Sequence, residues 1–325
     1  TNDETPTLSG TAESGTVVTV FEGFATLGQA TVDVGGTFSF STGTFSEGEH
    51  SITATAADSA GNVSSSSNSL SLVIDLTPPT ITLTGADVTV AHSGSYSELG
   101  VTAQDAVDGT VTVNTSHSVD PSSVGTYIVT YSATDTAGNS STANRTVNVT
   151  DQTAPVITMS GDASVTVEAA TSYLDAGASA LDAVDGNITG TMVTVNPINS
   201  TTLQQPSTYT VTYTSTDAAA NTSTATRTVI IQDTINPVIT MLGNATETVE
   251  AKGTYTDSGA SASDTLDGNL TGSVTSVSTV NTDVLGSYTV TYSVSDANGN
   301  AAANVVRTVN VVDTTKPVIT LLGNA

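Results

Sequence analysis

Apolar and polar side chains alternate with a period of two along much of the chain, and this alternation predicts β-strands. Residues 127–135 show it clearly, because Tyr127, Val129 and Tyr131 fall on one face of an extended strand. The other face carries Ile128 followed by Thr and Ser, as expected for an antiparallel sheet with one solvated face. Gly, Asn and Asp separate the short strands, and no segment shows helical periodicity. The pattern therefore predicts an all-β chain of antiparallel β-sandwiches.

The pattern repeats about every 80 residues, so it also predicts the domain organisation. Each repeat begins at a linker in which three residues separate an Asp from a following Pro. The first module differs from the others, because it holds all five Phe residues and no Tyr. Short linkers that contain Pro cannot easily fold one module back on the next, so we expect an extended rod. The expected modules are residues 1–75, 76–151, 152–233 and 234–313, with residues 314–325 as the start of a further repeat.

Four short motifs, here called stations, recur in the same order within the later modules. The first is Tyr-x-Asp/Glu-x-Gly, at Tyr96, Tyr173 and Tyr255. An acidic turn follows, with the sequence DAVDG or DTLDG, at residues 105–109, 182–186 and 264–268. A tyrosine-rich strand then ends in Asp and Asn, as in TYIVTYSATDTAGN, and a last strand such as RTVNVTD leads to the next linker.

The strongly negative charge of the chain excludes some classes of binding partner. With 31 acidic and 5 basic side chains, the formal net charge is −26. This excludes nucleic acid, whose phosphates require clustered Lys and Arg, and it argues against attraction to an anionic membrane. No apolar run approaches the roughly 20 residues of a membrane span, so we expect no direct membrane insertion. The chain also has no Cys, so a divalent cation is the remaining way to reinforce small secreted modules.

The order of the expected strands brings the acidic stations together. If the strands run up and down in turn, the linker Asp, the acidic turn and the end of the tyrosine-rich strand lie at one pole, beside the preceding module. Calcium takes about six to eight oxygen ligands from carboxylates, amides, carbonyls and water, which is the chemistry that these stations offer. We therefore predict calcium at the module junctions. The expected ligands are Asp75, Asp105, Asp108, Asp135 and Asn139; Asp151, Asp182, Asp185 and Asp217; Asp233, Asp264, Asp267, Asp296 and Asn300; and Asp313 at the start of the partial repeat.

Simpler interpretations of these residues stay open. Asp and Asn are ordinary turn residues, and an Asp before Thr and Pro can cap an extended segment. Asp135 could pair with Arg145 across the hairpin instead of binding metal, and the pairs Asp217/Arg227 and Asp296/Arg307 repeat this arrangement.

Two further expectations concern the edges of the predicted sites. The acidic residue of the first station, which is Glu98, Asp175 or Asp257, could complete a metal site in a neighbouring module. In the third module, Ala220 replaces the Gly that precedes Asn in the other two, so we expect a different turn there and omit Asn221 from the ligands.

The motifs resemble those of known families. In the later modules PVITLLGN, VEA, YTDSGASASD, DGN and YTVTYSVSDANGN resemble bacterial immunoglobulin-like repeats of secreted proteins, including a group similar to an Ig-like domain of insecticidal crystal proteins. In the first module TLSGTAESGTVVTVFEG and TATAADSAGN resemble the Ig-like extender repeats of giant adhesins. The resemblance implies an extracellular bacterial stalk or spacer, often stiffened by calcium.

We do not expect an enzyme. His50, His92 and His117 share no station, no GxSxG motif is present, and the carboxylate pair recurs in each repeat as a structural ligand set does. Carbohydrate binding is the main alternative, in accessory modules of a secreted polysaccharide-degrading enzyme, although Trp is absent and most Tyr fall on core faces.

The sequence thus predicts an internal piece of a large secreted or surface-anchored bacterial adhesin. We expect a monomeric spacer whose immediate partners are the flanking Ig-like domains of the same chain. Glycans or a host or abiotic surface would be bound by domains outside these residues.

Overall fold

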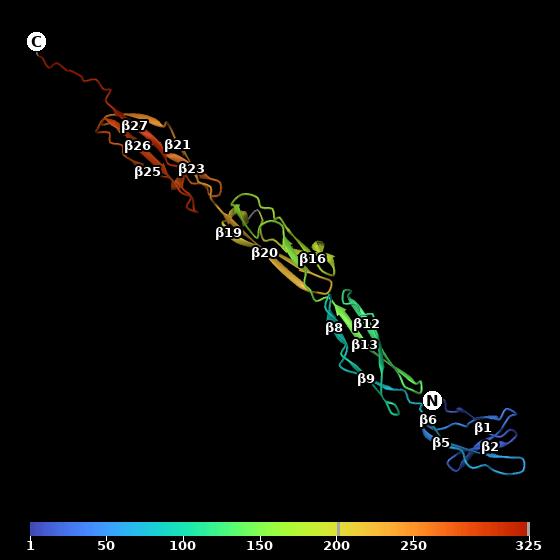
Figure 1. Ribbon diagram of the computed structural model, residues 1–325. Coiled ribbons are helices and arrows are strands. Elements are labelled where there is room, and N and C mark those ends of the chain that lie inside the picture. Colours follow the sequence, from blue (N-terminus) through green and yellow to red (C-terminus); the bar gives the residue numbers. More distant parts are fainter. Residues whose placement is uncertain (200–201, 324–325) are drawn as a thin grey trace. The chain divides into compact units, whose positions relative to one another are not determined.

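The computed structural model describes residues 1–199 and 202–323, and nearly all of its regular structure consists of β-strands (Figure 1). This confirms the all-β class of tandem Ig-like sandwiches. The helices of the described residues are three single 3-10 turns, η1 (Thr189–Thr191), η2 (Thr202–Gln204) and η3 (Thr271–Ser273), and none of these is long and apolar enough to span a membrane. Two compact units make up the chain, residues 1–152 and 153–325.

The first module packs a two-stranded sheet, β1-β4, against a four-stranded sheet with the order β3-β2-β5-β6. All of its strand pairs are antiparallel. Val18, Val20 and Ile52 are buried between the sheets together with Phe45, as their alternation in the sequence requires. The strands are β1 (Thr7–Thr11), β2 (Val17–Glu22), β3 (Ala25–Thr31), β4 (Thr37–Ser41), β5 (Gly48–Ala57) and β6 (Leu70–Ile74).

The second module, also in the first unit, has a three-stranded sheet, β10-β9-β7, and a four-stranded sheet, β11-β12-β13-β8. On β12 the side chains of Val129, Tyr131 and Ala133 are fully buried, whereas Ile128 is half exposed, so the predicted faces are confirmed. The strands are β7 (Thr80–Leu83), β8 (Val88–Ala91), β9 (Val101–Asp105), β10 (Gly109–Val111), β11 (Val113–Ser116), β12 (Gly125–Thr134) and β13 (Ser140–Thr150).

The second unit repeats this plan twice. Its sheets have the orders β14-β16-β17 and β15-β20-β19-β18, then β21-β23-β24 and β22-β27-β26-β25. The third module has β14 (Val156–Met159), β15 (Ser164–Glu168), β16 (Ala178–Asp182), β17 (Gly186–Asn187), β18 (Val193–Val195), β19 (Ser207–Thr216) and β20 (Thr222–Gln232). The fourth has β21 (Val238–Met241), β22 (Thr246–Glu250), β23 (Ala260–Asp264), β24 (Gly268–Asn269), β25 (Thr275–Ser278), β26 (Gly286–Ser293) and β27 (Val305–Val312).

Each later module contains one parallel strand pair, which the sequence did not predict. β8 pairs with β13, β15 with β20 and β22 with β27, all in parallel. The pair arises because the chain first pairs in the smaller sheet, through β7, β14 or β21, and then crosses to the larger sheet to lie beside the last strand. The remaining strand pairs in each module are antiparallel. The ends of β9 and β12 therefore lie at the same pole of the second module, and the equivalent strands repeat this in the other two.

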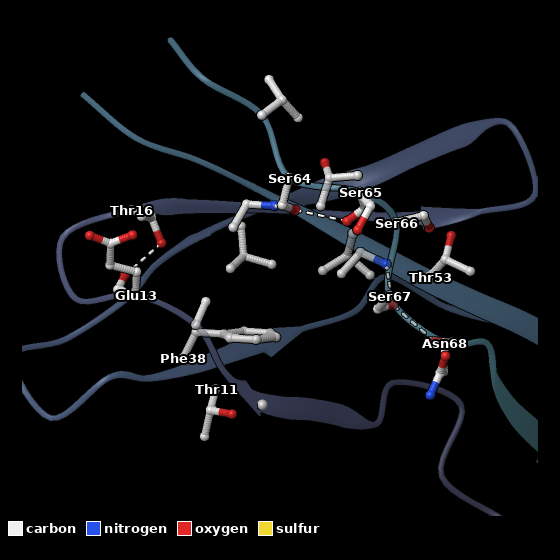
Figure 2. A pocket seen from close by; sticks show the side chains of 18 of the residues that line it. Thr11, Glu13, Thr16, Phe38, Thr53, Ser64, Ser65, Ser66, Ser67 and Asn68 are labelled. Carbon is white, nitrogen blue, oxygen red and sulfur yellow. Dashed lines mark hydrogen bonds between the residues drawn. The ribbon is translucent and has the colours of Figure 1, made fainter. Parts of the chain in front are cut away.

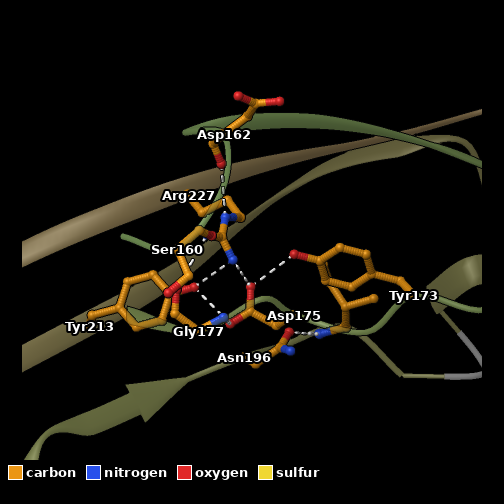
Figure 3. Close-up of polar contacts among 9 residues, drawn as sticks. Ser160, Asp162, Tyr173, Asp175, Gly177, Asn196, Tyr213 and Arg227 are labelled. Atoms are coloured by element: carbon orange, nitrogen blue, oxygen red, sulfur yellow. Dashed lines mark hydrogen bonds and ion pairs between the residues drawn. The ribbon is translucent and has the colours of Figure 1, made fainter. Parts of the chain in front are cut away.

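A buried arginine lies at the centre of each later module, and Figure 3 shows the third-module example. The guanidinium of Arg227 forms an ion pair with Asp175 and donates to the carbonyl oxygens of Ser160 and, at 3.0 Å, Asp162. Two tyrosine hydroxyls also donate to the Asp175 carboxylate, Tyr173 at 2.9 Å and Tyr213 at 2.6 Å. The cluster therefore connects β20 with the loop between β14 and β15, whose carbonyl groups have no strand partner there.

Burial and hydrogen bonding set the protonation states of this cluster. Burial raises the pKa of Tyr213 to about 12, and its hydrogen bond to Asp175 contributes to the rise. Burial also acts to raise the pKa of Asp175, but the hydrogen bonds from Tyr213, Tyr173 and Arg227 outweigh it and hold the pKa of that carboxyl below its usual value. The Asp175 carboxylate is therefore charged and the tyrosines are neutral at physiological pH.

The same arginine clusters overturn two of the sequence-based alternatives. Arg145 lies opposite Val129 in the β12–β13 ladder and pairs with Glu98, not with Asp135. The ladder ends at the pair Thr134–Ser140, so Asp135 is already in the hairpin loop. Arg227 lies opposite Val211, and Arg307 lies opposite Val290 and pairs with Asp257 at 2.7 Å. Consequently Glu98, Asp175 and Asp257 bind the arginine of their own module instead of completing a metal site in a neighbouring one.

We expect Arg227→Met to destabilise the third module by about 3–5 kcal/mol, because it leaves the Asp175 carboxylate in the core without its cation. Differential scanning calorimetry of the full chain measures this as the loss or downward shift of one module's transition. Lys252→Met, which removes a cation from an exposed turn, is the matched control and should leave every transition in place. Equal effects of the two substitutions would contradict the structural role assigned to Arg227.

Candidate functional site

The acidic turn of each later module is closed by its first aspartate. In the second module Asp105 ends β9, and its Oδ1 accepts hydrogen bonds from the backbone N–H groups of Val107 at 2.8 Å and Asp108 at 3.0 Å. Asp182 and Asp264 make the same two bonds in the third and fourth modules. The other oxygen, Oδ2, is buried in Asp105 and in Asp264, and no described residue donates to it. The acidic turns of the second and fourth modules thus each hold a carboxylate oxygen to which no described residue donates.

The hairpin after the tyrosine-rich strand forms the second part of the site. Asp135 Oδ1 accepts from the backbone N–H of Asn139 at 2.7 Å, and Asn139 Nδ2 donates to Asp135 Oδ2 at 2.9 Å. The same Nδ2 donates to the backbone carbonyl of Asp75 at 2.8 Å, so the hairpin is tied to the linker. Thr136 N donates to Asp108 Oδ2 at 2.6 Å, which ties the hairpin to the acidic turn. The fourth module repeats these contacts with Asp296, Asn300, Asp233 and Asp267.

Carboxylates from these segments converge in both units. Asp75, Asp108 and Asp135 each offer one oxygen, and these oxygens all lie within 4.8 Å of one another. Asp233, Asp264 and Asp267 form a second such group within the same limit. Asp105 lies close enough to Asp75 to raise its pKa, and Asp296 affects Asp233 in the same way. The structure therefore brings the predicted ligands of the second and fourth modules together.

The remaining predicted ligands are placed as follows. In the third module the backbone N–H of Ala218, next to Asp217, donates to Asp185 Oδ2 at 2.7 Å, so the acidic turn and the hairpin meet as in the other modules. Asp151 directly follows β13 and belongs to the first unit. Asp313 follows β27, and its Oδ1 accepts from the backbone N–H of Thr315 at 3.2 Å.

The different turn expected around Asn221 is not observed. Asp217 N donates to the carbonyl of Asn221, and Ala220 N donates to that of Asp217, which is the bonding of the Asp135–Asn139 turn. Ala220 reaches this turn with φ = 71°, in the left-handed region where Gly138 and Gly299 stand in the other modules. The ladder and the Asp217–Asn221 hydrogen bonds thus impose on alanine a conformation that favours glycine.

The aspartates of the cluster differ in their electrostatics. Burial raises the pKa of Asp75, and the neighbouring carboxylates of Asp105 and Asp135 raise it further. For Asp135, burial acts in the same direction, but the hydrogen bonds from Asn139 outweigh it and lower the pKa overall. Burial likewise raises the pKa of Asp233, while the bonds from Asn300 lower that of Asp296. The environment therefore destabilises the charged form of the linker aspartates, Asp75 and Asp233, and stabilises that of the hairpin aspartates, Asp135 and Asp296.

A second set of contacts holds the linkers, and the sequence analysis missed it. Glu250 at the end of β22 accepts from the hydroxyls of Thr314, at 2.7 Å, and Thr315, at 2.8 Å, and these bonds lower its pKa to about 2. Glu168 holds Thr234 in the same way. The VEA motif was the available signal, because its Glu ends the strand that runs parallel to the last one.

Two family models match most of the chain, and both describe Ig-like domains. A family model described as "Bacterial surface protein, Ig-like domain" matches residues 81–149, 157–231 and 239–311. A second, described as "Bacterial Ig-like domain", matches residues 1–76. Among solved structures, a protocadherin gammaB7 EC3-6 fragment is 14% identical and covers 95% of this chain and 96% of that chain, with a TM-score of 0.32.

Two curated relatives are longer than this chain. Hyalin of Lytechinus variegatus is 31% identical over 306 residues, which are 86% of this chain and 56% of hyalin. An uncharacterized protein of Acholeplasma phage L2 is 28% identical over 243 residues, which are 70% of this chain and 33% of that protein. The chain thus spans between a third and somewhat over half of these relatives. Since the surface-protein model matches more than half of its residues, the chain belongs to the bacterial surface protein Ig-like domain family, as a tandem array of such domains.

Proposed function

We propose that this chain is a spacer region of a large secreted or cell-surface bacterial adhesin, and that calcium stiffens its module junctions. Membership of the surface-protein Ig-like family supports an extracellular spacer or accessory module, of a kind that is typically non-catalytic. The observation that carries the proposal is the convergence of the linker aspartate with the acidic turn and the hairpin of the following module. A ligand bound there contacts both the connection between two modules and the module itself.

The residues of the second-module site fit a hard divalent cation. Asp75, Asp108 and Asp135 supply clustered carboxylates, and Asp105 Oδ2 is buried without a donor. No Lys or Arg belongs to residues 1–144, so no side-chain cation compensates these charges locally. A calcium ion takes several such oxygens at once and relieves their mutual repulsion. The protein's own contribution is to hold the oxygens in place through backbone N–H groups and Asn139.

We expect calcium to raise the unfolding temperature of the modules. Extracellular sites commonly have dissociation constants of about 10⁻⁴ to 10⁻³ M, so a site at the tight end gains roughly 2.7 kcal/mol at about 10 mM calcium. For a module of this size the midpoint rises by about 10 °C or more. Magnesium should do less, because it requires stricter octahedral geometry and loses its water reluctantly. Melting curves with calcium, magnesium or chelator test this, and identical midpoints in all three would contradict the proposed sites.

Two substitutions of the same chemistry should act in opposite directions in chelator. The raised pKa of Asp75 means that its carboxylate costs stability above that pKa, so Asp75→Asn should raise the cation-free midpoint at pH 7 by a few degrees. The lowered pKa of Asp135 means that its charged form stabilises the fold above the ordinary pKa of Asp, so Asp135→Asn should lower the midpoint. Both variants should lose the calcium response of the second module. Asp58→Asn, in the related turn of the first module, is the control that should keep it.

The spacer proposal also predicts how the molecule behaves in solution. In calcium, small-angle scattering should give a maximum dimension several times the length of one module, and removal of calcium should broaden the distribution of dimensions. A compact particle in calcium would contradict a spacer. Asp75→Asn alters only the linker before the second module, so in calcium it should broaden the distribution of dimensions less than removal of all calcium does.

Carbohydrate-binding modules of a secreted enzyme are the other candidate, and a glycan array tests them. The rings of Tyr131, Tyr213 and Tyr292 are fully buried against the arginine of their own module, so they offer no stacking platform for sugar rings. We expect no specific glycan binding in calcium. Reproducible binding that depends on the loops of one module would favour this second function.

A further inference from the structure

The hairpin loop of the fourth module contains the one Asn-Gly sequence of the chain, Asn298–Gly299. Glycine has no Cβ, so its backbone nitrogen can approach the side-chain carbonyl carbon of the asparagine before it and react there. In the second and third modules the residue at the position of Asn298 is alanine, Ala137 or Ala219. The fourth module is therefore the one that places this reactive pair at its acidic pole.

The loop leaves the Asn-Gly pair accessible to water. Asn298 and Gly299 are exposed, and both lie outside the ladder of β26 and β27. The backbone N–H of Gly299 donates to the carbonyl of Asp296 at 3.4 Å, which is long for a hydrogen bond of this type. The nitrogen that would attack the asparagine side chain is therefore held weakly by the turn.

The side-chain amide of Asn298 points to the carboxylate cluster of its module. Its Nδ2 donates to Asp233 Oδ2 at 3.0 Å, and the backbone N–H of Asn298 donates to Asp296 Oδ1 at 2.9 Å. Asp233 belongs to the group that it forms with Asp264 and Asp267, whose oxygens lie within 4.8 Å of one another. The amide thus donates a hydrogen bond to the linker aspartate at the edge of a group of like charges.

The second module shows the same pole without this amide. Ala137 takes the place of Asn298 there. Among the described residues, the Asp75 side chain accepts one hydrogen bond, from the backbone N–H of Thr77 at 3.3 Å. The amide donor to the linker aspartate is therefore an addition in the fourth module, and Asn298→Ala should restore the arrangement of the second.

The first module has the same turn, from Asp58 to Asn62, in a different setting. Ala60 takes the place of Asn298, and the turn borders a groove that Phe38 and the serines at 64–67 also line (Figure 2). No group of three clustered carboxylates among the described residues includes Asp58. The turn by itself thus makes no such site, which requires both the asparagine and the neighbouring linker aspartate.

Deamidation of an Asn-Gly pair proceeds through a cyclic imide. The backbone nitrogen of Gly299 bonds to Cγ of Asn298, the Cγ–Nδ2 bond breaks, and the proton of that nitrogen leaves with the side-chain NH2 group as ammonia. Water then opens the imide and returns a proton to the nitrogen. Opening at Cγ gives aspartate, and opening at the backbone carbonyl carbon gives isoaspartate. Either way, one amide and one water yield one carboxylic acid group, ionised at neutral pH, and one ammonia.

From these observations we propose that Asn298 is a deamidation site, and that its conversion adds a carboxylate to the aspartates at the pole of the fourth module. The new charge replaces the donor that faces Asp233 Oδ2, so the cation-free module gains a repulsive contact. Calcium binds further carboxylate oxygens, and its affinity depends on the charge of its ligands. Deamidation therefore makes this module more dependent on calcium, an effect that rests on the proposed function, whereas the loss of the amide does not.

Mass spectrometry of the full chain tests the modification without reference to calcium. The chain is incubated in chelator at mildly alkaline pH, and the mass gain that replaces NH2 by OH is located in peptides covering residues 294–301. It should appear at Asn298 before any other asparagine. Gly299→Ala should slow it by about tenfold or more, because a Cβ hinders the attacking nitrogen. An amide retained at Asn298 throughout, or lost equally fast in the Gly299→Ala chain, would overturn the proposal.

The third module shows that the Gly299→Ala chain can keep this turn. Ala220 stands at the position of Gly299 and adopts φ = 71° in a loop with the same hydrogen bonds. A slower reaction in this variant therefore reports the hindered attack and not a lost fold.

Calorimetry and calcium titration of two matched variants test the consequence. Asn298→Asp reproduces the product, and Asn298→Ala removes the amide without adding charge. In chelator the fourth-module midpoint of Asn298→Asp should lie several degrees below that of Asn298→Ala. In calcium the difference should vanish or reverse, with calcium bound about three- to tenfold more tightly by Asn298→Asp.

The second module, whose loop carries Ala137, is the internal reference and should respond identically in both variants. Equal behaviour of the two variants in chelator and in calcium would overturn the assigned consequence. A wild-type chain with no calcium response would overturn the proposed function and the calcium dependence together, whereas the mass measurement decides the modification on its own.

Discussion

Repulsion among carboxylates at one pole of the second and fourth modules is the interaction on which the arrangement of these modules depends. The strand order delivers the linker aspartate, the acidic turn and the hairpin to the same place, and local hydrogen bonds hold them there. Asp135 is supported by Asn139, whereas Asp75 is buried beside like charges with little compensation. The fold itself therefore holds these oxygens in position, which would lower the ordering cost of the proposed cation binding.

The arginine clusters place a cation in each sandwich core and neutralise it with a carboxylate of the same module. Arg145, Arg227 and Arg307 are three of the five basic residues, and each is paired inside its own module. Each guanidinium also bonds to carbonyl groups in the loop before the parallel strand, so it connects the first and last parts of the module. Lys252 and Lys316 are then the only Lys or Arg side chains outside the cores, so almost all other charged groups there are carboxylates. Because the arginines are buried in the cores, they do not offset the negative charge of the carboxylates on the surface.

Strand edges decide how modules of this kind complete themselves. In the later modules the first strand covers the edge of the smaller sheet before the chain crosses to the larger one. β7, β14 and β21 thus pair with the main-chain groups of β9, β16 and β23, which would otherwise form an open edge.

The sequence by itself determined the sandwich class, the repeat and the pole at which Asp75, Asp105 and Asp135 meet, because period-two alternation and strand order are sufficient for these. It did not determine the partner of Arg145, since the length of the hairpin loop sets the register and moves Asp135 out of the ladder. It could not show that Ala220 adopts a glycine-like turn, because local propensity favours another conformation and the surrounding hydrogen bonds override it. The contact between Glu250 and Thr314 was equally hidden, since it depends on β22 lying parallel to β27. Only the tertiary structure decided which partner each charged side chain takes, because those partners are tens of residues apart and no local periodicity encodes their approach.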